Sequence, residues 1–218
     1  DEYLFTEAQY VAAAMDILNQ SGLFHLRVCG LNHSGEYVCG EYQVDGPAVD
    51  LSGDPLPRTT LSEDMIVPVA DVPTFLRLTL RPWNEVSFTL EIADRFYVMF
   101  GYDFQMWVGT EVQPTLNKIR ETGLYVDEGR PNTRANDGPW RIAWSHPDPD
   151  DAEMVIDLGD CVVDLDRAMI QTVFGWSHEH PAQDCRRIQP CHAERFRQFV
   201  DVDFRFEEFN YELINDNF

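Results

Sequence analysis

Residues 76–108 read LRLTLRPWNEVSFTLEIADRFYVMFGYDFQMWV, and this stretch decides the fold class. Apolar side chains occupy every second position within its segments: Leu76, Leu78 and Leu80, then Val86, Phe88, Leu90 and Ile92, then Phe96, Val98 and Phe100, then Phe104, Met106 and Val108. Such alternation puts one face of each strand on a core and the other face outward. The stretch therefore predicts a series of neighbouring antiparallel strands.

Helices and further strands are expected on both sides of this region. Capping-box spacing from Thr6 to Gln9 and an apolar stripe at helical spacing predict the first helix. The expected helices cover residues 6–20, 111–122, 161–174 and 192–199. The expected additional strands cover residues 24–30, 36–44, 140–145, 153–158, 201–206 and 209–213.

The order of these elements predicts an α+β fold. We expect a mainly antiparallel sheet, a meander of about six to nine strands with three to four helices packed on it. The chain has 218 residues, which suits a single domain over 1–218. Similar helix ends at residues 21–24 and 122–125 leave open a weak two-unit organisation, 1–110 and 111–218.

The outstanding feature of the composition is negative charge. The chain carries 38 acidic and 16 basic residues, a formal net charge of −22, and Lys118 is its only lysine. Such a charge repels nucleic acid and anionic membrane surfaces and attracts cationic proteins. Compositional bias of the genome is the competing explanation, since all basic residues except Lys118 are arginine. We expect a basic protein partner, no nucleic acid and no membrane.

Two features bear on the cellular compartment. Five cysteines are few for a disulfide scaffold and their number is odd, which favours a reduced chain. The first residues, Asp1-Glu2-Tyr3, resemble no signal peptide, and no apolar run reaches the roughly 20 residues of a membrane helix. We therefore expect a cytoplasmic protein.

Acidic residues are concentrated beside aromatic ones in two stretches, 148–166 and 201–212. Carboxylates that could pair with Lys or Arg, together with aromatic anchors, are what a binder of basic proteins needs. The predicted partner-binding residues are Asp148, Asp150, Asp151, Glu153, Asp201, Asp203, Glu207, Glu208 and Tyr211. The alternatives are a charge-protected edge strand at the C-terminus and a calcium-binding turn at 148–153.

The richest group of metal-capable side chains lies near residue 185. It consists of His178, His180, Cys185, Cys191 and His192. Imidazole and thiolate are zinc ligands, but the short Cys-x2-Cys spacing of a typical zinc site is missing. A polar loop and a Cys185–Cys191 disulfide remain open as alternatives. Cofactors are otherwise not expected.

Motifs of catalysis are missing from the sequence. It contains neither G-x-S-x-G nor a phosphate-binding G-x-x-x-x-G-K-[ST] loop. Cys29 and Cys39 lie on expected strands, where a cysteine is usually a small core residue. These observations favour a binding protein over an enzyme.

Three hypotheses follow for the function. The first is an acidic protein-binding inhibitor, such as an immunity or antitoxin-type protein that neutralises a basic toxin. The alternative is an acidic secretion-type chaperone that binds a client segment. The second alternative is a hydrolase or structural zinc protein that uses the His178/His180/Cys185/Cys191/His192 group.

Overall fold

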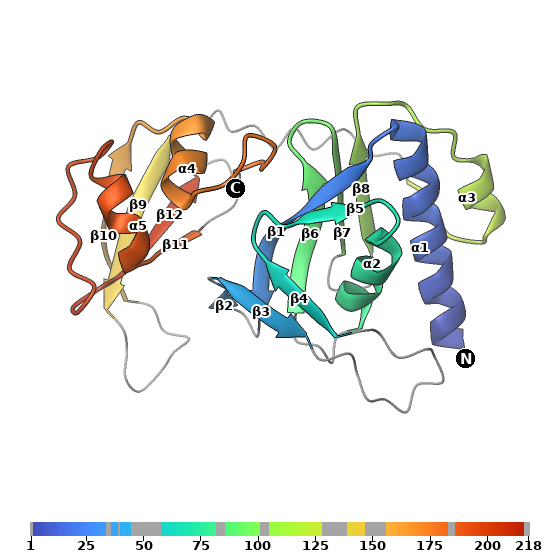
Figure 1. Ribbon diagram of the computed structural model, residues 1–218, viewed down its shortest axis with the longest axis horizontal. Coiled ribbons are helices and arrows are strands. Elements are labelled where there is room, and N and C mark those ends of the chain that lie inside the picture. The colour runs from blue at the N-terminus through green and yellow to red at the C-terminus, as the bar shows by residue number, and fades with distance from the viewer. Residues whose placement is uncertain are drawn as a thin grey trace. The chain divides into compact units, whose positions relative to one another are not determined.

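The computed structural model divides the chain into two compact units (Figure 1). Unit 1 comprises Asp1–Asn132 and the tripeptide Glu179–Pro181, and unit 2 comprises Thr133–His178 and Ala182–Phe218. The structure describes residues 2–33, 36–38, 40–44, 58–81, 86–100, 105–127, 139–146, 156–182 and 186–215. Within this part of the chain, no helix is long and apolar enough to cross a membrane.

Unit 1 is built on a six-stranded antiparallel sheet with the order β2-β1-β6-β7-β8, in which β5 also pairs with β1. Its strands are β1 (His25–His33), β2 (Glu36–Tyr37), β5 (Ile66–Pro68), β6 (Val86–Ile92), β7 (Phe96–Phe100) and β8 (Met106–Thr110). A separate hairpin pairs β3 (Glu41–Val44) with β4 (Thr59–Ser62).

Apolar side chains of the helices and of one face of the sheet form the core of unit 1. The helices are α1 (Glu2–Ser21), α2 (Val72–Leu80) and α3 (Asn117–Glu121). The first core cluster includes Leu18 of α1, Leu76 of α2 and Leu90 of β6. Because alternate strand residues point to opposite sides, the residues between these core positions lie on the other face of the sheet.

Unit 2 has its own four-stranded antiparallel sheet, in the order β10-β9-β12-β11. Its elements are β9 (Trp140–His146), β10 (Ile156–Val163), α4 (Arg167–Phe174), β11 (Arg186–Ile188), α5 (Pro190–Phe196) and β12 (Asn210–Asn215). A second core cluster holds Trp140, Ile142 and Phe196, which are almost fully buried. Each unit therefore encloses its own apolar core.

The predicted α+β class with antiparallel sheets is confirmed. We expected one domain, with a division at residue 110 as the alternative. The division between the units falls after Asn132, because β8 pairs with β7 and Ile119 of α3 lies in the first core.

Several expected elements differ in the structure. The strand expected at 36–44 is divided into β2 and β3, and β3 pairs with β4. Leu76, Leu78 and Leu80 lie on helix α2 and not on a strand. Residues 111–116 precede helix α3, which begins only at Asn117. The helix expected at 161–174 begins at Arg167, because 161–163 complete strand β10.

The C-terminal strand is shorter than predicted. Residues 201–206 belong to a loop, and strand β12 begins at Asn210. The alternation of 201–206 reflects aromatic side chains that turn onto the core of unit 2 from a loop, as described below. These aromatic side chains are therefore buried without belonging to a strand.

Candidate functional site

Polar and titratable side chains gather on the face of the six-stranded sheet that lies opposite the helices. They are His25, Arg27 and Cys29 of β1, Thr89 and Glu91 of β6, and Tyr97 of β7. The register between β1 and β6 places Arg27 opposite Glu91 and Cys29 opposite Thr89. Glu179 and His180 of the tripeptide, which belongs to unit 1, contact the same face.

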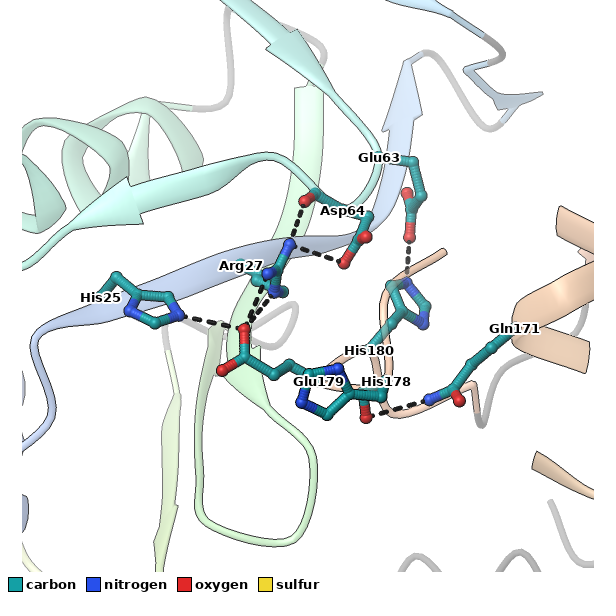
Figure 2. A network of polar contacts seen from close by, with 8 residues as sticks. All are labelled: His25, Arg27, Glu63, Asp64, Gln171, His178, Glu179 and His180. Atoms are coloured by element: carbon teal, nitrogen blue, oxygen red, sulfur yellow. Dashed lines mark hydrogen bonds and ion pairs between the residues drawn. The ribbon is translucent and has the colours of Figure 1, made fainter. Parts of the chain in front are cut away.

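Arg27 is the centre of an ion-pair network (Figure 2). Its Nε and Nη2 atoms lie 2.8 and 2.7 Å from Oε2 of Glu179. Its Nη1 atom donates to Asp64, 2.9 Å from the carbonyl oxygen and 3.2 Å from Oδ1. His25 Nε2 donates to the same Glu179 oxygen at 3.1 Å. Arg27 therefore joins the tripeptide to the turn after β4.

The environment of Glu179 favours its ionised form. The hydrogen bond from His25, reinforced by Arg27, holds the pKa of the Glu179 carboxyl below its usual range, against the opposing effect of burial. The backbone is fixed as well, since the amide of Ala93 donates to the carbonyl of Glu179 at 2.8 Å. The tripeptide is thus held by charge and by the main chain.

A β-bulge in β1 positions a second carboxylate. The register between β1 and β6 shifts between Cys29 and Asn32, and Gly30 has a φ of 69°, a left-handed conformation that glycine adopts without strain. At the bulge, the backbone amides of Gly30 and Leu31 donate to Oε1 and Oε2 of Glu63, at 2.9 and 2.8 Å. The bulge therefore orients Glu63.

Three metal-capable side chains meet next to this bulge. One ligand atom from each of Cys29, Glu63 and His180 lies within 4.8 Å of the other two. His180 Nε2 donates to Glu63 Oε1 at 2.8 Å (Figure 2). Cys29 and His180 are 0% exposed, and the Glu63 side chain is 15% exposed. A thiol, an imidazole and a carboxylate form a donor set that suits zinc.

The same three groups could in principle serve nucleophilic catalysis. A cysteine nucleophile needs a histidine base, and the base needs an orienting carboxylate. A substrate must also reach the sulfur, and the Cys29 side chain is fully buried. The burial favours a metal or a structural role for this cluster over covalent catalysis.

The structure separates the group of metal-capable residues predicted from the sequence. His180 lies in unit 1, whereas His178, Cys191 and His192 lie in unit 2. His178 and Cys191 are exposed. His192 is buried, and its Nδ1 atom accepts the amide proton of Gln189 as part of the α5 capping box. Cys185 lies outside the described residues.

The C-terminal acidic residues lie on a loop that rests on aromatic rings. Asp201, Asp203, Glu207 and Glu208 are exposed. Phe204 and Phe206 stack with ring centroids 5.6 Å apart, and Tyr211 packs edge-on against both. The Tyr211 hydroxyl also accepts a hydrogen bond from the amide of Arg205 at 3.0 Å. We call residues 201–209 the acidic loop.

The remaining predicted partner-binding residues divide into two groups. Tyr211 is 3% exposed, so its ring supports the acidic loop from within. The other group lies outside the described residues and consists of Asp148, Asp150, Asp151 and Glu153.

The carboxylates of the acidic loop differ in their pairing. Glu208 pairs with Arg205 at 2.9 Å. Within the described part of the chain, the carboxylates of Asp201, Asp203 and Glu207 have no ion-pair partner.

Comparison with known protein families, characterised proteins and solved structures found no significant match. The candidate sites are therefore inferred from the geometry of the described residues alone. The sequence pattern predicts Cys29 as a core residue on a strand, and Glu63 belongs to no motif in the sequence. Only the fold brings residues 29, 63 and 180 together, because no local spacing connects them.

Proposed function

We propose that this protein binds a cationic protein partner, as an acidic inhibitor of the immunity or antitoxin type in the cytoplasm would. The observation that carries the proposal is the acidic loop. It presents the carboxylates of Asp201, Asp203 and Glu207 to solvent on a base of packed rings. The net charge of −22 adds long-range attraction for a basic surface.

The packing of the loop supports this proposal on energetic grounds. Binding is weakened when a flexible segment must be ordered in the complex. Here the stacked pair Phe204 and Phe206 and the hydrogen bond to Tyr211 already order the backbone that carries the acids. Arg or Lys side chains of a partner would then pair with carboxylates held in place.

Affinity capture from the source cell, followed by binding measurements on the purified partner, tests the proposal. The test variant combines Asp201→Asn, Asp203→Asn and Glu207→Gln. The matched control combines Glu41→Gln, Glu121→Gln and Asp127→Asn, which removes the same charge from exposed positions of unit 1. At about 0.2–1 kcal/mol per exposed ion pair, the three substitutions should together weaken binding about 3- to 140-fold more than the control does.

Salt provides the second measurement. From about 0.01 M to about 1 M salt, the screening length falls from about 30 Å to about 3 Å, so the association rate should fall steeply. A neutral or acidic partner, or equal affinity for the test and control variants, would count against the proposal.

A further inference from the structure

We propose that Cys29, Glu63 and His180 form a binding site for one Zn²⁺ ion. This inference is independent of the acidic loop, because all three residues belong to unit 1. The three side chains supply a thiolate, a carboxylate and an imidazole, each an established zinc ligand. They come from strand β1, from the turn that follows β4, and from the tripeptide Glu179–Pro181.

The spacing of the donor atoms is compatible with zinc. With bonds of about 2.0–2.3 Å and tetrahedral angles, two ligand atoms on one zinc ion are about 3.3–3.6 Å apart. Glu63 Oε1 and His180 Nε2 are 2.8 Å apart, and all three donor atoms lie within 4.8 Å of one another. These separations bracket the spacing that a zinc ion requires.

The charge balance suits a divalent cation, and the donor types favour zinc over calcium and magnesium. A zinc ion with one thiolate, one carboxylate and one neutral imidazole has no net charge, so the buried position leaves no uncompensated charge. Calcium and magnesium prefer six or more oxygen ligands. Here only Glu63 donates oxygen, whereas the other two ligands donate sulfur and nitrogen. The thiol and imidazole thus select a softer cation.

The surrounding hydrogen bonds position the ligands in advance. Both oxygens of Glu63 accept amide protons from the bulge, Oε1 from Gly30 and Oε2 from Leu31. His180 is held in place through its neighbour Glu179, which is bound by Arg27. Support of ligands by such outer contacts is characteristic of metal sites.

Three protein ligands leave one of four coordination positions to a water molecule. The ion would join three segments that are distant in the sequence. Zinc should therefore raise the thermal unfolding midpoint of the metal-free protein, since a ligand that binds only the folded state stabilises it.

The test is a zinc titration of the full chain, freed of metal by a chelator, against a competing chromophoric chelator. The wild type should bind one Zn²⁺ per chain. Cys29→Ser and His180→Gln should each weaken binding by more than about 100-fold, since even outer-contact substitutions cost 10- to 100-fold. The matched controls, Cys191→Ser and His178→Gln, alter exposed residues of unit 2 and should bind zinc as the wild type does.

Cobalt provides an independent readout. Co²⁺ bound by the wild type and by Cys191→Ser should show a thiolate-to-cobalt charge-transfer absorption, and Cys29→Ser should lack it. Circular dichroism of the metal-free variants checks their folding. If Cys29→Ser does not fold, absence of the absorption in the wild type still overturns the proposal. Failure of the wild type to bind stoichiometric zinc, or loss of zinc in Cys191→Ser, overturns it too.

Discussion

Glu7 and Arg81 form a buried ion pair between α1 and the end of α2. Arg81 Nε and Nη2 donate to Oε2 and Oε1 of Glu7 at 2.7 and 2.9 Å. Both residues are buried, and the hydrogen bond to Glu7 raises the pKa of Arg81 above its usual value. Arg77 Nε lies farther from Glu7, 3.4 Å from Oε1. Two parallel bonds between buried side chains make the Glu7–Arg81 pair sensitive to loss of one partner.

Arg81→Met should lower the free energy of unfolding by about 3–5 kcal/mol, because Glu7 would keep a buried charge without its main partner. The double variant Glu7→Leu/Arg81→Met should recover most of that loss. Denaturant unfolding of the wild type, both single variants and the double variant measures the coupling. Equal stability of Arg81→Met and the double variant would contradict this account.

His192 is a buried histidine whose neutral form supports a helix cap. Burial, assisted by the positive charge of Arg195, lowers the pKa of His192 to about 4. The unfolded chain takes up the proton near pH 6.5, whereas the folded chain takes it up only near pH 4. Stability contributed by neutral His192 is therefore complete above pH 6.5 and is lost as the pH falls toward 4.

His192→Gln should remove this pH dependence while keeping the cap, since Gln at this position of a capping box also accepts the Gln189 amide. Unfolding free energies at several pH values from 7 to 4 provide the measurement. The wild type should lose stability relative to His192→Gln, by at most about 1.4 kcal/mol per pH unit. Parallel curves would show that His192 titrates normally.

At the scale of elements, Asp166 of the stretch 148–166 caps a helix. The Asp166 side chain caps α4 by accepting the amide proton of Met169 at 2.8 Å. Asp166→Ala should therefore cost about 0.5–2 kcal/mol of unfolding free energy. Asp164→Ala changes the same charge at an exposed site outside the cap and should cost much less. Thermal or denaturant unfolding distinguishes the two.

The element most clearly misjudged from the sequence is α2. Leu76, Leu78 and Leu80 alternate with polar residues over five positions, which is too short a window to separate a strand from a helix. Val72, Phe75 and Leu76 have helical spacing, and Pro73 lies in the first turn, where proline is tolerated. Over the longer stretch from Asp71, the helical spacing outweighs the alternation.

Strands β6 and β7 were predictable because their alternating residues meet a core on one face only. The candidate zinc site was not predictable, since only strand pairing and the placement of the tripeptide connect Cys29, Glu63 and His180. The sequence pointed to His180 through its neighbours His178 and Cys185. The structure associates it instead with residues more than a hundred positions away, as Glu63 shows.

At the scale of the whole molecule, the net charge of −22 has a cost for stability. Like charges repel more strongly in the compact state than in the expanded unfolded chain. Raising NaCl from about 0.01 M to about 1 M should screen this repulsion and raise the thermal unfolding midpoint. Scanning calorimetry provides the measurement, and a midpoint that stays constant or falls with salt would contradict it.

The tripeptide Glu179–Pro181 also has a consequence for the order of events during synthesis. Arg27 and Glu179 are 152 positions apart, so at about 5–20 residues per second the ribosome adds Glu179 about 8–30 s after Arg27. Until then the guanidinium of Arg27 has Asp64 but not Glu179 beside it. The strands of the six-stranded sheet can therefore pair early in translation. The polar face of this sheet is completed only when most of the chain has been made.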